Sequence, residues 1–148
     1  MAIRNLYTIG YEGSDLDSFI EALAHLGITT VLDIRELPLS RKRGFSKTPL
    51  SGALAEVGIG YRHERALGCP PEIRNRLRHD GDYRRYFEAF NRYLLTQLDV
   101  VEHLVAELDG SVALLCYERD PAYCHRRSVA EQMRELFALI PRHVAVPA

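Results

Sequence analysis

The pattern of apolar and polar positions predicts strands and helices that alternate along the chain. Short runs rich in β-branched and other apolar residues are typical of strands, whereas apolar residues repeating every three or four positions indicate helices with one buried face. Strands are expected over residues 3–10, 28–34, 59–63, 111–116 and 143–146. Helices are expected over residues 14–26, 48–57, 73–77, 83–108 and 121–140, the fourth with a break near Asp99.

Capping residues give the expected helix starts. Ser14 is predicted to begin the first helix. Thr48 and Asp120 are each followed by a proline, which is the usual order of an N-cap and the first helical residue. This reading places Cys124 in the first turn of the last helix, where the helix dipole would lower the pKa of its thiol.

Strands alternating with helices predict an α/β fold with a parallel sheet covered on both faces. Because connections between parallel strands are nearly always right-handed, we expect a three-layer, Rossmann-like domain with a mostly parallel sheet. The sequence contains no internal repeat or linker, so residues 1–148 are expected to form a single domain.

Composition narrows the class of protein. The 148 residues are 47% hydrophobic and 26% charged, and the formal net charge is −1. These values are typical of globular proteins, and no apolar run is long enough to cross a membrane. The N-terminus lacks the features of a signal peptide, so a cytoplasmic location is expected. In that compartment Cys69, Cys116 and Cys124 are expected to be free thiols, with metal binding or catalysis as alternatives.

Positive charge is concentrated in the middle of the chain. Residues 41–92 contain twelve arginines and lysines against six acids, and ten of the twelve are arginines. Arginine is suited to bidentate recognition of phosphates and carboxylates. A genome that favours arginine codons is an equally good explanation, and the basic loop 41–47 has the composition of an ordinary solvated loop.

The predicted strands end in polar residues, and in a parallel sheet these ends share one edge, where ligands usually bind. Strand 3–10 ends in Gly10, Tyr11, Glu12 and Gly13; the next strands end in Asp33 and Arg35, in Tyr61 and His63, and in Cys116 and Glu118. Gly10 and Gly13 would let a ligand approach the backbone, and the helix start at Ser14 would favour an anion. Both features also have explanations without a ligand. The glycines could be required by the turn alone, and Asp33 and Arg35 could simply form an ion pair with each other.

The segment from Cys116 to Arg126 carries the other candidate groups. Cys116 and Cys124 are possible nucleophiles, His125 a possible base, and Arg126 a possible anion ligand. Cys116 is equally well explained as a small buried apolar residue. The cysteine spacing does not match the short pairs of structural zinc sites, so no metal is expected. The spacing also does not fit a phosphatase-type phosphate loop.

Several ordered motifs in this chain resemble the Domain of Unknown Function 488 family. They are Thr8–Tyr11, Val31–Ser40, Phe45–Lys47 with Leu50, Gly58–Tyr61 with Leu67 and Gly68, and Leu115–Arg126. Tyr11 departs from the family pattern, in which histidine is common. The resemblance implies that these elements, including Ser40, belong to one site; it implies no reaction, because the family is uncharacterised.

The sequence therefore predicts an enzyme or enzyme-like domain that binds a phosphate-bearing small molecule, such as a nucleotide or nucleoside derivative. The expected catalytic residues are Cys124, Glu118, Asp33, Cys116 and His125. The expected ligand-binding residues are Gly10, Tyr11, Gly13, Ser14, Arg35, Ser40, Tyr61 and Arg126. A non-catalytic module that binds nucleic acid or protein is one alternative, and a thiol-redox or metal protein is another. No cofactor is indicated.

Overall fold

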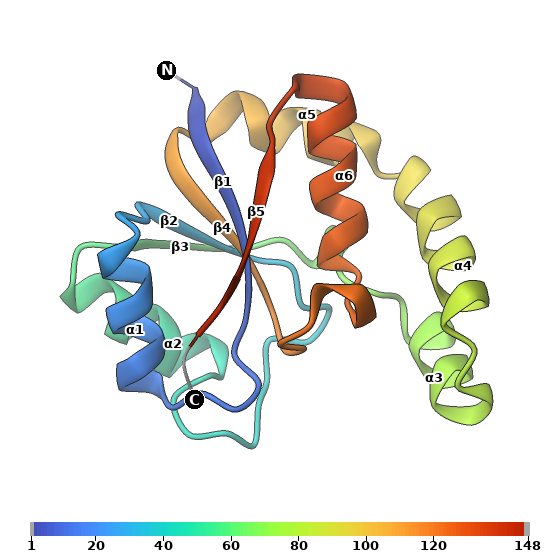
Figure 1. The fold of residues 1–148 in the computed structure, drawn as a ribbon, viewed down its shortest axis with the longest axis horizontal. Coiled ribbons are helices and arrows are strands. Elements are labelled where there is room, and N and C mark those ends of the chain that lie inside the picture. Colours follow the sequence, from blue (N-terminus) through green and yellow to red (C-terminus); the bar gives the residue numbers. More distant parts are fainter. Residues whose placement is uncertain (1, 147–148) are drawn as a thin grey trace.

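The computed structural model describes residues 2–146 and contains one five-stranded sheet. The strand order is β3-β2-β4-β1-β5, and every neighbouring pair is parallel (Figure 1). The strands are β1 (Ile3–Gly10), β2 (Thr30–Asp33), β3 (Gly60–His63), β4 (Gly110–Cys116) and β5 (Pro141–Ala145). The prediction of a parallel α/β sheet is confirmed, including the short last strand.

Helices cover both faces of the sheet, as predicted (Figure 1). The helices are α1 (Leu16–His25), α2 (Lys47–Glu56), α3 (Pro71–Asp80), α4 (Tyr83–Leu95), α5 (Leu98–Glu107) and α6 (Arg126–Phe137). Helices α1 and α2 pack on one face, and α4, α5 and α6 on the other. The protein is thus a three-layer domain.

Strand β4 shows why the sheet must be covered twice. Val112 and Leu114 point into the cluster beneath α4, α5 and α6, whereas Ala113 and Leu115 point into the cluster beneath α1 and α2. All four side chains are completely buried. An uninterrupted apolar run is therefore the expected sequence of this central strand.

Several helix boundaries differ from the predictions. Asp15, and not Ser14, caps α1 by accepting a hydrogen bond from the backbone N–H of Ser18 at 2.8 Å. Helix α2 begins at Lys47 with Ser46 at the cap position, so Thr48 is already helical. The long helix expected over 83–108 divides at Thr96 and Gln97, slightly before Asp99.

The helix predicted after Asp120 begins later than expected. Asp120 accepts a hydrogen bond from the N–H of Ala122 at 2.9 Å and caps only the 3-10 turn Pro121–Tyr123. Cys124 then has an extended backbone, and α6 starts at Arg126. The placement of Cys124 in the first turn of a helix is therefore wrong: it lies two residues before α6, and its sulfur is 3.5 Å from the N–H of Arg126, the first helical residue.

Helix α3 is longer than predicted and runs beside α4, away from the sheet (Figure 1). None of its side chains is fully buried, which explains the weak apolar pattern in the sequence. Within residues 2–146, no helix has the length and apolar character needed to cross a membrane.

Candidate functional site

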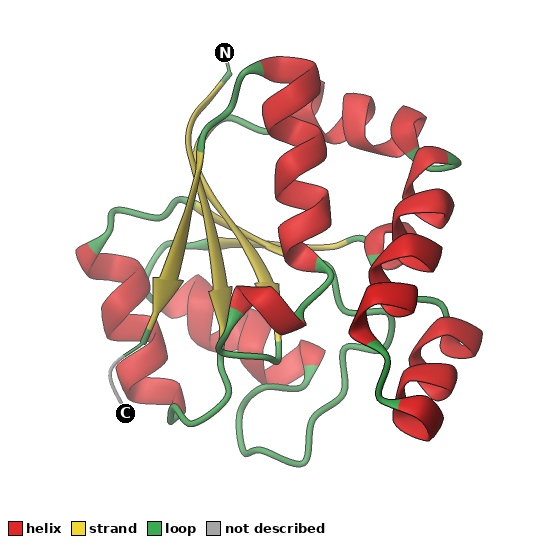
Figure 2. Cartoon of the chain, turned by 45° about the vertical axis from the view of Figure 1, so that its right-hand side comes forward, coloured by secondary structure: helices red, strands yellow, loops and turns green. Residues whose placement is uncertain are grey.

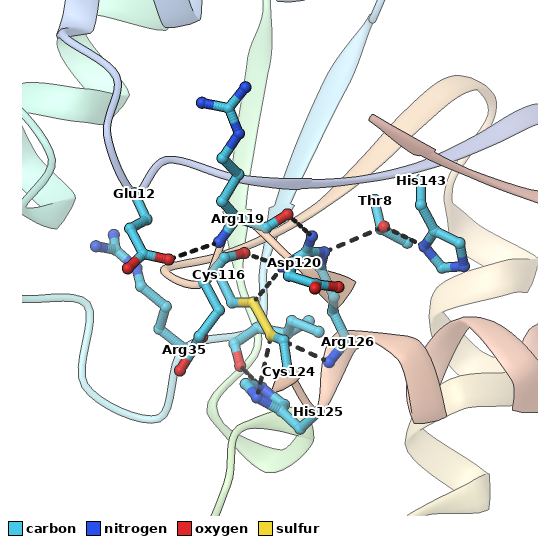
Figure 3. Close-up of a disulfide and its surroundings, with 12 residues drawn as sticks. Thr8, Glu12, Arg35, Cys116, Arg119, Asp120, Cys124, His125, Arg126 and His143 are labelled. Carbon is cyan, nitrogen blue, oxygen red and sulfur yellow. Dashed lines mark hydrogen bonds between the residues drawn. A yellow bond between two sulfur atoms is a disulfide. The ribbon is translucent and has the colours of Figure 1, made fainter. Parts of the chain in front are cut away.

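The carboxyl ends of β1 and β4 lie side by side at one edge of the sheet (Figure 2), and β2, which pairs with β4 in parallel, ends at the same edge. In the strand register Gly10 is opposite Cys116, and Asp33 is opposite Leu115. The chain from Cys116 to Arg126, which we call the cysteine segment, crosses this edge before entering α6 (Figure 3). The polar residues at the strand ends are thus brought to one place.

Asp33 and Arg35 form a closed, buried ion pair. The Arg35 Nη2 lies 2.7 Å from Asp33 Oδ2, and its Nε donates to Asp33 Oδ1 at 2.9 Å. The Tyr61 hydroxyl also donates to Asp33 Oδ2, at 2.5 Å. Arg35 Nη1 donates to the carbonyl oxygen of Phe45 at 2.7 Å. These contacts occupy the groups expected to bind a ligand and tie the loop after β2 to the sheet.

The glycine-rich turn after β1 packs against protein. A Cβ atom on Gly10 would overlap the carbonyl oxygen of Glu118. The N–H of Glu12 donates to the carbonyl oxygen of Tyr117 at 2.8 Å, and its carboxylate accepts from the N–H of Arg119 at 3.0 Å. The small residue at position 10 therefore makes room for the cysteine segment.

Gly13 and Ser14 lie in the same turn. Gly13 has a φ of 81°, in the left-handed region that favours glycine. Ser14 is buried, and its N–H donates to the carbonyl oxygen of Tyr11 at 3.0 Å. Its hydroxyl has no hydrogen-bond partner among the described residues.

Arg126 is completely buried, and its donors are used inside the protein (Figure 3). Its Nε donates to the hydroxyl of Thr8 at 3.1 Å, and its Nη2 to the carbonyl oxygen of Arg119 at 3.0 Å. Its Nη1 donates to the carbonyl oxygen of Glu118 and lies 3.3 Å from the sulfur of Cys116. Arg126 thus holds the cysteine segment against β1 and β4.

The chain of contacts continues from Arg126 to β5. Because the Thr8 hydroxyl accepts from Arg126, its own hydrogen is available for His143 Nδ1, 2.6 Å away. Burial lowers the pKa of His143, which agrees with a neutral ring that accepts this bond. The segment is therefore braced by residues from β1, β5 and α6.

Cys116 and Cys124 are joined by a disulfide (Figure 3). The expectation of three free thiols is wrong for this pair, and only Cys69 is free among the described residues. Cys116 ends β4, and the 3-10 turn folds the chain back so that Cys124 meets it. The sequence could not show this, because a separation of eight residues does not reveal where the segment turns.

His125 lies beside the disulfide. Its Nε2 is 2.7 Å from the carbonyl oxygen of Ile34. Because a carbonyl only accepts, Nε2 carries the hydrogen, which leaves Nδ1 as an acceptor 3.9 Å from Cys124 Sγ. Burial lowers the pKa of His125 to about 4, so the ring is neutral at neutral pH.

Cys116, Cys124 and His125 are also the group of described residues best placed to hold a metal ion. The ligand atoms of Cys116, Cys124 and His125 lie within 4.8 Å of one another. Two of them are the bonded sulfurs of the disulfide, which offers no thiolate to a metal. The absence of a metal stays a prediction.

A cavity of about 450 Å³ opens at this edge between the loop after β2, helix α3 and the cysteine segment. Its size suits a small molecule. Six of the predicted site residues line it: Tyr11, Arg35, Ser40, Cys116, Glu118 and His125. The other predicted site residues are not among its lining residues: Gly10, Gly13, Ser14, Asp33, Tyr61, Cys124 and Arg126.

Several lining residues were not selected from the sequence. They are Glu36, Leu37, Leu39, Arg41, Cys69, Arg74, Leu77, Arg78, Tyr86, Tyr117 and Tyr123. Helix α3 supplies Arg74 and Arg78, and Arg78 lies just beyond the helix expected over residues 73–77. The four-residue spacing of these arginines, on one face of a helix, is the signal that could have identified them.

Two carboxyl groups face the cavity in different surroundings. Glu36 is buried and paired with Arg65 at 3.1 Å and with Arg74 at 3.4 Å. Glu118 has no such ion pair among the described residues, and burial raises the pKa of its carboxyl group.

Comparison with known proteins identifies the family. Residues 15–133 match the family model described as "Domain of unknown function DUF488". The match covers more than half of the chain, so the chain belongs to this family, as its motifs suggested. A search of curated proteins gives no match, and neither does a search of solved structures. The matched range contains the cavity residues from Arg35 onward and the whole cysteine segment.

Proposed function

We propose that this member of the DUF488 family binds a small phosphate-bearing molecule, of the nucleotide or nucleoside-derivative class, in the cavity at the carboxyl edge of the sheet. The proposal rests on one observation: arginines from the loop after β2 and from α3 line the same cavity, whose walls also contain tyrosines. The expectation from the sequence is retained, but the binding groups are different ones.

The positive charge comes chiefly from Arg41, Arg74 and Arg78. Arg41 and Arg78 form no salt bridge with any described residue, and Arg74 is only weakly engaged by Glu36 at 3.4 Å. Arg35 also lines the cavity, but Asp33 neutralises it. Guanidinium groups that lack a protein partner are suited to phosphate oxygens.

The remaining walls suit a flat aromatic group. Tyr117 and Tyr123 lie on the cysteine segment and are about half exposed, and Tyr86 of α4, which is buried, also lines the cavity. Aromatic side chains of this kind stack on nucleobases, at roughly 1–3 kcal/mol per base. Leu37 and Leu39, both exposed, extend the apolar surface.

Glu118 gives the cavity a group able to take part in proton transfer. The raised pKa of its buried carboxyl group extends the pH range in which it holds a proton. We propose it as the general acid if the bound molecule reacts.

Titration calorimetry with adenosine monophosphate tests the proposal. Arg78→Ala should weaken binding about tenfold, because it removes a charge-assisted contact worth on the order of 1.5–3 kcal/mol before compensation. Arg84→Ala is the matched control, since Arg84 is a highly exposed arginine of α4 paired with Glu88. Adenosine and inorganic phosphate, each with half of the contacts, should both bind more weakly.

Added salt should also reduce the affinity for adenosine monophosphate, because exposed charges are screened. Equal effects of the Arg78→Ala and Arg84→Ala substitutions would contradict the proposal, as would the absence of binding by all three probes.

A further inference from the structure

Arg126 is a buried cation without a carboxylate partner. No carboxylate of the described residues lies within ion-pair distance of its guanidinium group, which is completely buried. Its hydrogen-bond acceptors are the Thr8 hydroxyl, two carbonyl oxygens and the sulfur of Cys116. A buried charge is costly unless an opposite charge compensates it. Of these four acceptors, only the sulfur can become an anion near neutral pH.

We propose that Cys116 and Cys124 form a redox-active thiol–disulfide pair, in which Cys116 is the nucleophilic thiolate and Arg126 its counter-ion. The proposal rests on the geometry around the two sulfurs, and it is independent of whether the cavity binds a phosphate.

The two sulfurs have different surroundings. Cys116 lines the cavity and lies 3.3 Å from Arg126 Nη1. Cys124 is as deeply buried as Cys116 but does not line the cavity; its sulfur lies next to the unprotonated Nδ1 of His125 and 3.5 Å from the backbone N–H of Arg126, with no guanidinium group on it. After reduction, Cys116 is stabilised as a thiolate, whereas Cys124 can stay a thiol that donates to His125. Cys116 is therefore the attacking sulfur, and Cys124 is the resolving one.

Reduction by a small thiol follows directly from this arrangement. The reductant's thiolate reaches Cys116 through the cavity, forms a mixed disulfide with it and displaces Cys124, which takes up a proton. A second reductant thiolate then attacks the reductant sulfur of the mixed disulfide and releases Cys116 as a thiolate. Two electrons pass to the protein, and the two reductant thiols leave as one disulfide. Oxidation by a small disulfide is the reverse sequence.

The cavity also indicates the class of exchange partner. Arg41 and Arg78 flank the route to Cys116 and carry charges that no described residue pairs. A thiol with carboxylate groups should therefore react faster than a cationic thiol of similar size. In the cytoplasmic location predicted from the sequence, acidic low-molecular-weight thiols would be available for this exchange.

Cys69 is the cysteine with which the reactivity of the Cys116 thiol can be compared. It lines the same cavity and is nearly as buried as Cys116, but it has no guanidinium group on its sulfur. Burial raises the pKa of the Cys69 thiol to about 11. The other titratable and charged groups near the pair and its neighbours His125 and His143 are Asp33, Arg74, Glu118, Asp120, Arg127 and Glu131.

The test follows alkylation of the reduced full-length protein by iodoacetamide, measured by mass spectrometry as a function of pH. In Cys124→Ser, which isolates Cys116, we expect Cys116 to react at neutral pH at least about tenfold faster than Cys69, with a midpoint below the ordinary cysteine value of ~8.5. Arg126→Gln on the same background should raise that midpoint. Arg126→Gln also removes hydrogen bonds that hold the cysteine segment in place. If this variant does not fold, the reactivity of Cys116 relative to Cys69 in Cys124→Ser alone tests the proposal.

Redox titration of the wild type in mixtures of reduced and oxidised glutathione completes the test. The proposal expects a reversible transition of two electrons, located at Cys116 and Cys124, while circular dichroism remains that of the folded protein. Cysteamine, a cationic thiol, should reduce the pair more slowly than glutathione. A pair that is reduced only on unfolding would overturn the proposal, and so would a Cys116 no more reactive than Cys69. A failure of nucleotide binding would leave both results unchanged.

Discussion

Gly10 is the residue at which the backbone of β1 and the cysteine segment meet. The carbonyl group of Glu118 occupies the place where a Cβ atom would lie, and the same carbonyl accepts a hydrogen bond from Arg126. A side chain at position 10 would therefore displace both the disulfide and its brace. This close approach is the physical reason why glycine is required there.

We expect Gly10→Ala to lower the free energy of unfolding by about 1–3 kcal/mol, the usual cost of overpacking a buried site. Gly52→Ala is the control, because nothing lies within 4 Å of the added methyl group on this exposed residue of α2. This control should raise the free energy of unfolding by roughly 0.5–1 kcal/mol, since alanine is the better helix former. Urea denaturation of the two variants measures both effects, and the same sign for both would refute the account.

His125 should make stability depend on pH. Its pKa is about 4 in the folded protein, because burial opposes the charged ring, and about 6.5 in the unfolded chain. Between these values the unfolded state binds more protons, so acidification from pH 6.5 to 4 should cost roughly 3 kcal/mol of stability.

The measurement is urea denaturation of the wild type and of His125→Gln across that pH range. The wild type should lose more stability than the variant on acidification. Parallel pH profiles would show that the ring does not titrate as described.

At the scale of single residues, the sequence indicated which side chains are unusual but not what they contact. Arg126, Asp33 and Arg35 were recognised as unusual charges, and all three are buried, but their partners are groups of the protein. Whether a charge faces a ligand or an internal acceptor depends on how loops close, and no local pattern encodes that. Arg74 and Arg78 were passed over because exposed α3 has little apolar periodicity.

Among the elements, the strands and the helices with a strong apolar face could be predicted, because burial dictates their composition. Strand β1 was predicted to the residue, and β5 was found despite its length. The errors fall at helix ends, where several residues can cap. Asp120 is the clearest case: its cap is real, but it serves a 3-10 turn, so α6 starts six residues later at Arg126.

Two helix ends allow a reciprocal test of backbone strain. The residue that caps the C-terminus of α6 is Ala138, with a φ of 58°, and the corresponding residue of α3 is Gly81, with a φ of 63°. The left-handed conformation costs an alanine roughly 1 kcal/mol relative to glycine. Thermal unfolding should show that Ala138→Gly stabilises the protein and that Gly81→Ala destabilises it, each by about 0.5–1 kcal/mol. Effects of the reverse sign would contradict this description of the two caps.

For the molecule as a whole, alternating strands and helices were sufficient to predict three layers, because chain connectivity and handedness leave few arrangements. The strand order places β4 between β1 and β2, so three separate parts of the chain deliver their ends to one edge. The cavity beside that edge could not be predicted, since α3 and the loop after β2 contribute half of its wall. The match to the DUF488 family covers β2, α3, β4 and the cysteine segment, whereas β1 lies before the matched range.

The central claim is that this cavity is where the protein binds its ligand. Chemical-shift mapping by NMR, with adenosine monophosphate added to the isotope-labelled protein, tests it most directly. The account predicts that the largest shifts occur at the amides of Tyr117, Glu118 and Arg78, while those of α5, which supplies no residue to the cavity lining, remain unchanged. Shifts concentrated elsewhere, or none at saturating nucleotide, would contradict it.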